Sequence, residues 1–81
     1  MNLFDFKLLP ENEQIDLLYK EGIYIGKRKV NNQDAVLYQF EAFYAEIYYR
    51  EYRKYISRIF CFSSTTLLDP YLEQIVVVNL V

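Results

Sequence analysis

Four segments between residues 22 and 62 are rich in Tyr, Phe, Ile and Val, and short polar breaks separate them. These segments are 22–30, 35–40, 43–50 and 55–62. Aromatic and β-branched side chains fit a pleated sheet, whereas the Asn, Gln and Asp residues of the first break favour a turn. The pattern predicts four strands in an antiparallel meander, with breaks at 31–34, 41–42 and 51–54.

A single helix is the rival interpretation of residues 40–60. Aromatic and Ile side chains in this range also recur at helical spacing, and Ala42, Ala45 and Arg50 suit a helix. We favour strands because Tyr, Phe and Ile dominate the range. A two-stranded sheet over 22–40 alone would also be marginally stable in water.

Helices are predicted on both sides of the strands. Residues 10–21 begin with a proline, carry two acids in the first turn, and are followed by Gly22, a residue common at helix ends. Asp69 and Pro70 are typical of an N-cap and the first residue of a short helix over 70–75.

Together these elements predict one α+β domain over residues 1–81, in the order α-β-β-β-β-α. The sheet is a four-stranded antiparallel meander with an N-terminal helix and a short C-terminal helix, both on one face. A chain this short has a thin core. Because it carries nine Tyr and six Phe, some Tyr rings should remain partly exposed.

Groups that commonly catalyse reactions are scarce in this chain. It contains no His, and its single cysteine, Cys61, lies in an apolar segment, which favours a buried, inert thiol. Glu41 and Glu46 would fall on opposite faces of a continuous strand, which favours solvated charges over an acid–base pair. One cysteine and no His also exclude ordinary zinc sites. We therefore predict a protein with no enzymatic activity, metal or cofactor.

Targeting signals are not evident in the sequence. Residues 1–7 have no basic segment followed by a long apolar run, and no apolar run in the chain approaches the length of a membrane span. A single cysteine cannot form an intramolecular disulfide, which fits a reducing compartment. We therefore expect a cytoplasmic protein without membrane contact.

Basic residues gather in the middle of the chain, although its net charge is −2. The first and third turns of a meander lie at the same end of the sheet, so the basic residues around them should converge on one rim. The candidate anion-binding rim is Lys27, Arg28, Lys29, Arg50, Arg53 and Lys54. With Tyr52 and Tyr55 beside it, this rim would suit single-stranded nucleic acid or another polyanion. We favour the alternative that these charges keep the hairpin ends soluble, since the net charge is negative.

Alternation along residues 43–50 separates two faces of the predicted third strand. The set expected in the core is Phe43, Ala45, Ile47 and Tyr49. The candidate interface with another protein or a second copy is Tyr44, Glu46, Tyr48 and Arg50. Glu46 and Arg50 would pair across a two-fold axis. In the alternative interpretation, the Tyr rings lie flat on an exposed sheet.

Several segments resemble those of small uncharacterised bacterial proteins of similar length. These segments are 22–28 (GIYIGKR), 37–40 (LYQF), 43–49 (FYAEIYY) and 68–72 (LDPYL). The resemblance departs at Ala45 and over 51–54, and it implies the strand arrangement without a function.

The predicted function is that of a small non-catalytic protein-interaction module, which binds another protein or a second copy of itself. The alternative is weak binding of nucleic acid or another polyanion through the basic rim. Nucleic acid ranks lower because the sequence has no RNA-binding signature.

Overall fold

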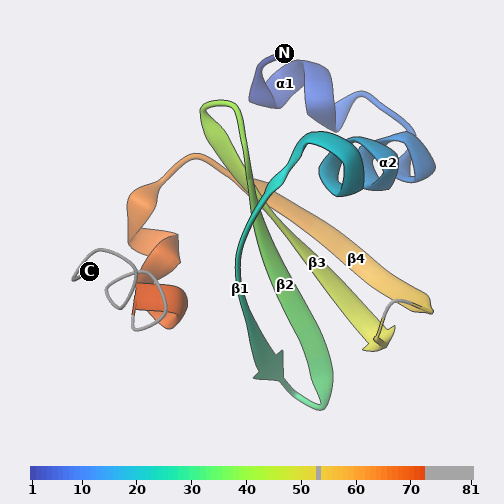
Figure 1. Cartoon of the computed structure of the whole chain (residues 1–81), viewed down its shortest axis with the longest axis vertical. Helices are drawn as coiled ribbons and strands as arrows, with labels where there is room; N and C mark the ends of the chain where they lie inside the picture. Colours follow the sequence, from blue (N-terminus) through green and yellow to red (C-terminus); the bar gives the residue numbers. More distant parts are fainter. Residues whose placement is uncertain (53, 73–81) are drawn as a thin grey trace.

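A computed structural model of the chain describes residues 1–52 and 54–72 (Figure 1). Its helices are α1 (Leu3–Lys7), α2 (Glu11–Glu21) and the 3-10 helix η1 (Thr65–Tyr71). Its strands are β1 (Ile23–Val30), β2 (Gln33–Phe40), β3 (Phe43–Glu51) and β4 (Tyr55–Phe62). The predicted α+β fold with a four-stranded antiparallel meander is confirmed, and the rival single helix over 40–60 is wrong.

The four strands form one sheet in the order β1-β2-β3-β4, and every neighbouring pair is antiparallel. Asn31 and Asn32 form the turn between β1 and β2, with left-handed φ angles of 49° and 67°. Asn tolerates this conformation better than most residues, and two such residues match the twist of a hairpin. The first and third turns lie at the same end of the sheet, as the meander predicts (Figure 1).

Gly22 ends α2 and leads the chain into β1. Its backbone N–H donates to the Leu18 carbonyl oxygen at 3.0 Å, and its φ of −73° suits any residue. A Cβ atom at this position would lie only 2.5 Å from the same carbonyl oxygen. The helix therefore ends at a glycine because the backbone approaches closely there, not because a left-handed conformation requires it.

The main hydrophobic core lies on one face of the sheet, which we call the helix face because α1 and α2 cover it (Figure 1). Phe6 of α1 and Leu18 of α2 are fully buried there. The sheet contributes Val36, Tyr38, Phe40, Phe43, Ala45, Ile47 and Tyr49. All four residues of the third strand that were expected in the core are therefore buried in it.

The opposite face of the sheet, which we call the η1 face, carries a smaller cluster. Leu37, Phe62 and Tyr71 are buried in it. The prediction that both terminal helices cover one face is therefore wrong. The physical reason is that Leu37 and Phe62 leave apolar surface out of reach of the N-terminal helices, and the ring of Tyr71 covers it.

The C-terminal helix also differs from the one predicted over 70–75. η1 begins at Thr65 and contains Pro70, so Asp69 is not its N-cap. Short 3-10 helices are frequent connectors, and this one brings Tyr71 back onto the sheet. Residues 73–75 lie outside the described part of the chain, so that portion of the prediction stays untested.

Candidate functional site

A buried carboxylate lies at the centre of the η1 face. Glu46 of β3 is only 3% exposed. Its Oε2 atom accepts hydrogen bonds from the Tyr71 hydroxyl at 2.6 Å and from Arg28 Nη2 at 3.2 Å. Its Oε1 atom accepts a hydrogen bond from the Tyr48 hydroxyl at 3.0 Å. We call Arg28, Glu46, Tyr48 and Tyr71 the Glu46 cluster.

The register of the sheet brings the Glu46 cluster together. Arg28 of β1, Ala35 of β2 and Tyr48 of β3 lie in one row across the sheet. The small side chain of Ala35 leaves room for the guanidinium to extend over β2 toward β3. Burying a carboxylate is costly unless hydrogen bonds and an opposite charge compensate it, and both are present here.

The electrostatics of the Glu46 cluster fix the protonation of its tyrosines. Burial and the hydrogen bond to Glu46 raise the pKa of Tyr71 far above its ordinary value. Burial, and then the charge of Glu46, also raise the pKa of Tyr48. Partial burial lowers the pKa of Arg28, but Tyr71 and Glu46 together outweigh it, so the pKa is raised. At neutral pH the cluster holds two neutral phenols and a cation, which suits a structural clamp on η1 better than proton transfer.

The candidate interface residues have different environments. The expectation that Glu46 is a solvated charge is wrong, because the register and η1 bury it against Arg28. Tyr48 is also buried, and the Arg58 guanidinium lies 4.3 Å from the centre of its ring. Tyr44 is partly exposed and stacks on Phe62 at 5.6 Å. Of the four residues, only Tyr44 and the exposed Arg50 remain accessible.

Glu41, the other carboxylate considered for catalysis, lies at the surface in the turn between β2 and β3. Its Oε2 atom pairs with the N-terminal amine of Met1 at 2.6 Å. The two glutamates are therefore held by separate partners, and no described contact joins them.

The cations of the candidate rim contact acidic or aromatic neighbours in most cases. Two of them form ion pairs at the ends of the hairpins, Lys29 with Asp34 at 3.2 Å and Lys54 with Glu51 at 3.6 Å. Lys27 lies over the ring of Tyr52 at 4.1 Å, so the first strand does meet the third turn. Arg28 instead extends to Glu46 on the η1 face, and Arg53 lies outside the described residues. Of the described cations, Arg28 therefore contacts the η1 face, Lys27 contacts the third turn, and Lys29 and Lys54 pair with carboxylates at their own hairpin ends.

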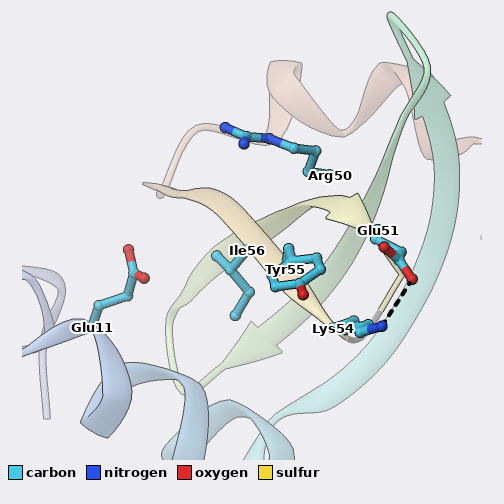
Figure 2. Close-up of a pocket in the computed structure, with 6 residues that line it drawn as sticks. All are labelled: Glu11, Arg50, Glu51, Lys54, Tyr55 and Ile56. Carbon is cyan, nitrogen blue, oxygen red and sulfur yellow. Dashed lines mark ion pairs between the residues drawn. The ribbon is translucent and has the colours of Figure 1, made fainter.

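An open cleft of about 600 Å³ adjoins the beginning of β4 (Figure 2). Its lining residues are Glu11, Arg50, Glu51, Lys54, Tyr55 and Ile56. Figure 2 shows Glu11 and Arg50 on opposite sides of the β4 ribbon, so the cleft reaches around the outer edge of this strand. The sequence analysis predicted Arg50 and Lys54 as candidate binding residues. It did not predict Glu11, because no pattern in the sequence indicates that α2 places Glu11 beside β4.

A strip of aromatic side chains crosses β3 and β4 on the η1 face. Phe62 lies between two rings: it stacks on Tyr44 with ring centres 5.6 Å apart, and it contacts Phe60 in a tilted arrangement with ring centres 5.5 Å apart. Arg58 lies 5.8 Å from the centre of the Phe60 ring, which is 37% exposed. We call Tyr44, Arg58, Phe60 and Phe62 the aromatic strip.

Cys61, on the helix-face side of β4, is half-buried rather than fully buried. Burial raises the pKa of its thiol, and the charge of Lys7 opposes this effect. A raised pKa lowers the thiolate population, which is the reactive form.

No family model, curated protein or solved structure matches the chain. The resemblance to small bacterial proteins therefore stays a prediction. In the described residues, no three His, Cys, Asp or Glu side chains are grouped so that they could hold a metal ion. No helix in the same part of the chain has the length and apolar character needed to cross a membrane.

Proposed function

We propose that this protein is a small non-catalytic protein-interaction module that binds its partner along the outer edge of β4. The observation that carries this proposal is the contrast between the two edge strands of the sheet, β1 and β4. An edge strand presents backbone N–H and C=O groups with which another chain can pair.

β1 has the features that protect an edge strand from association. Three consecutive cations, Lys27, Arg28 and Lys29, lie within it. A bulge between Tyr24 and Gly26 interrupts its register with β2, and η1 packs against it. Charges, bulges and a covering segment are the devices that natural sheets use against edge-to-edge pairing.

β4 has these features only in part: α1 packs against it, its pairing with β3 is irregular near its beginning, and it carries little charge. Arg58 is its only charged residue, and it contains neither Pro nor Gly. The irregularities in its pairing with β3 come before Arg58, so the remainder of the strand up to Phe62 keeps a regular register. No strand among residues 1–52 and 54–72 pairs with its outer side.

The surroundings of β4 add side-chain surface to this edge. The aromatic strip flanks it on the η1 face, and aromatic and Arg side chains are enriched at protein interfaces. Tyr44 and Arg50, the accessible members of the candidate interface, lie in the strip and in the adjoining cleft. A strand added at β4 would cover part of both surfaces.

The proposal includes a cytoplasmic location, which the single free thiol of Cys61 supports. The absence of catalytic activity is supported by the Glu46 cluster, whose polar groups already satisfy one another. Polyanion binding has less support, because Arg28, Lys29 and Lys54 already pair with carboxylates.

Capture from an extract of the cell of origin tests the proposed function. The bait proteins are the wild type, Phe60→Lys on the β4 edge, and Ile23→Lys, a matched change at an exposed position of the β1 edge. We expect the wild type and Ile23→Lys to retain a common partner, identified by mass spectrometry, and Phe60→Lys to lose it. A partner retained by all three proteins, each shown to be folded by circular dichroism, would contradict the proposed edge.

A further inference from the structure

We infer that the partner of the β4 edge is the β4 edge of a second copy of this chain, paired antiparallel about a two-fold axis. This inference rests on the proposed function, because it names what the edge binds. The two sheets would join into one continuous sheet, and the outer backbone groups of each β4 would find hydrogen-bond partners.

Two oppositely charged side chains mark the two ends of β4 on the helix face. Lys7 is the last residue of α1, which packs against β4, and its charge acts on the Cys61 thiol near the end of the strand. Glu11 is the first residue of α2 and lines the cleft with Ile56, near the beginning of the strand (Figure 2). Within the described residues, neither Lys7 nor Glu11 forms an ion pair.

Antiparallel self-pairing places the beginning of one β4 beside the end of the other. Glu11 of each copy then faces Lys7 of the second copy, and the two-fold axis repeats the contact. Parallel pairing of the same two edges would instead put the helix faces of the two copies on opposite sides of the joined sheet, so that Glu11 of one copy could not meet Lys7 of the other. The charges along the β4 edge of one copy are therefore complementary to those of a second copy whose β4 runs in the opposite direction.

The side chains of β4 also select a register. In an antiparallel pair related by an axis normal to the sheet, the axis must pass beside a residue, because opposed side chains share a face. An axis at Arg58 would oppose two guanidinium groups. An axis at Ile59 opposes Arg58 to Phe60 of the second copy on the η1 face. Arg58 already lies over its own Phe60 ring, and the same cation–π contact would then form between the copies.

Charge reversal measured by analytical ultracentrifugation tests this inference. The proteins are the wild type, Lys7→Glu, Glu11→Lys and the double variant, each over a concentration series. A single reversal creates two repulsive contacts per dimer, so we expect the dissociation constant to rise about tenfold or more. The double variant restores opposite charges, and its dissociation constant should return to within a few-fold of the wild type.

Matched controls come from the last turn of α2. Lys20→Glu and Glu21→Lys make the same charge changes at exposed positions of that turn. They should leave the dissociation constant unchanged. Circular dichroism of every variant confirms folding, which matters for Glu11→Lys because an acid in the first turn stabilises a helix.

Three results would overturn the inference. The first is a wild type that stays monomeric at about 1 mM, where even weak specific pairs associate. The second is a dimer that single reversals do not weaken, and the third is a double variant that fails to recover. None of these results bears on the proposed function. If Phe60→Lys abolished the capture of a partner from the extract, the β4 edge would still be shown to bind another protein.

Discussion

Tyr71 and Glu46 lie 25 residues apart in the sequence, and a hydrogen bond of 2.6 Å between them joins η1 to the sheet. Both side chains are buried, and Tyr48 and Arg28 share the same carboxylate. This contact holds η1 on the sheet, so that the part of the η1 face nearest β1 is covered by the 3-10 helix.

Substitution of Tyr71 by Phe tests the strength of this contact. The ring stays in place against Leu37 and Phe62, and only the hydroxyl is lost. We expect the free energy of unfolding to fall by about 1.5–3 kcal/mol, the range for a hydrogen bond to a charged group. Urea denaturation followed by circular dichroism measures the change.

Tyr55→Phe is the matched control for Tyr71→Phe, since the Tyr55 side chain is largely exposed. Loss of the Tyr55 hydroxyl should change the free energy of unfolding by less than about 0.5 kcal/mol. Equal losses in the two variants would show that the bond to Glu46 does not stabilise the fold.

Glu46→Gln tests the charge at the centre of the cluster. The new amide keeps the shape of the side chain, but it removes the negative charge that pairs with Arg28. Its N–H groups also face Arg28, Tyr48 or Tyr71, which all donate hydrogen bonds to the native carboxylate. We expect a loss of about 1.5–3 kcal/mol, below the range for a fully buried ion pair, because the Arg28 side chain that loses its partner is 30% exposed. Combining Glu46→Gln with Tyr71→Phe should cost less than the sum of the single losses. Additive losses would mean that the two side chains do not interact.

The stability of the protein should fall in strong alkali. The pKa of Tyr71 and that of Tyr48 are both raised on folding, so the folded state binds more protons than the unfolded state above the ordinary value of about 10. The stabilisation is complete below that pH and is lost as pH rises through the folded-state pKa. Denaturation at a series of pH values above 9 measures this slope, and Tyr71→Phe should make it shallower. An unchanged slope would contradict the assignment.

Cys61 should react slowly with alkylating reagents. Burial raises the pKa of its thiol, and little thiolate is present at neutral pH. Mass spectrometry should show slower modification by iodoacetamide in the folded protein than in urea. Lys7→Gln removes the charge that opposes this rise and should slow the reaction further, whereas Lys20→Gln should not. Equal rates for both variants would show that Lys7 does not act on the thiol.

The strands were predictable because their evidence is local. Tyr, Phe and Ile mark each strand, and residues with turn chemistry, such as Asn31 and Asn32, separate the first two. The Glu46 cluster was not predictable, because its members come from two strands, β1 and β3, and from the helix η1. Only the register after the bulge at Tyr24 and Gly26 places Arg28 within reach of Glu46.

The position of η1 was mistaken for a similar reason. Asp69 and Pro70 have the local pattern of a helix start, but the helix begins earlier, at Thr65. Tyr71 packs on the η1 face because Leu37 and Phe62 present apolar surface there. This contact joins residues far apart in the sequence, so the residues around Tyr71 alone could not predict it. The contrast between the two edge strands, by comparison, was already visible in the charges of β1 and in their scarcity in β4.

The last prediction concerns the basic residues of the third turn. Changing Arg50, Arg53 and Lys54 together to Gln should leave the protein folded, since Arg50 and Lys54 are exposed and the pair of Lys54 with Glu51 is a surface contact. We expect the wild type to bind single-stranded DNA and RNA no more tightly than the non-specific range of about 10⁻⁴ to 10⁻⁶ M at physiological salt. A titration followed by fluorescence anisotropy at several salt concentrations measures the affinity. A sub-micromolar affinity in the wild type, with a salt slope that falls by about one unit for each cation removed, would establish phosphate contacts and favour polyanion binding over the β4 edge.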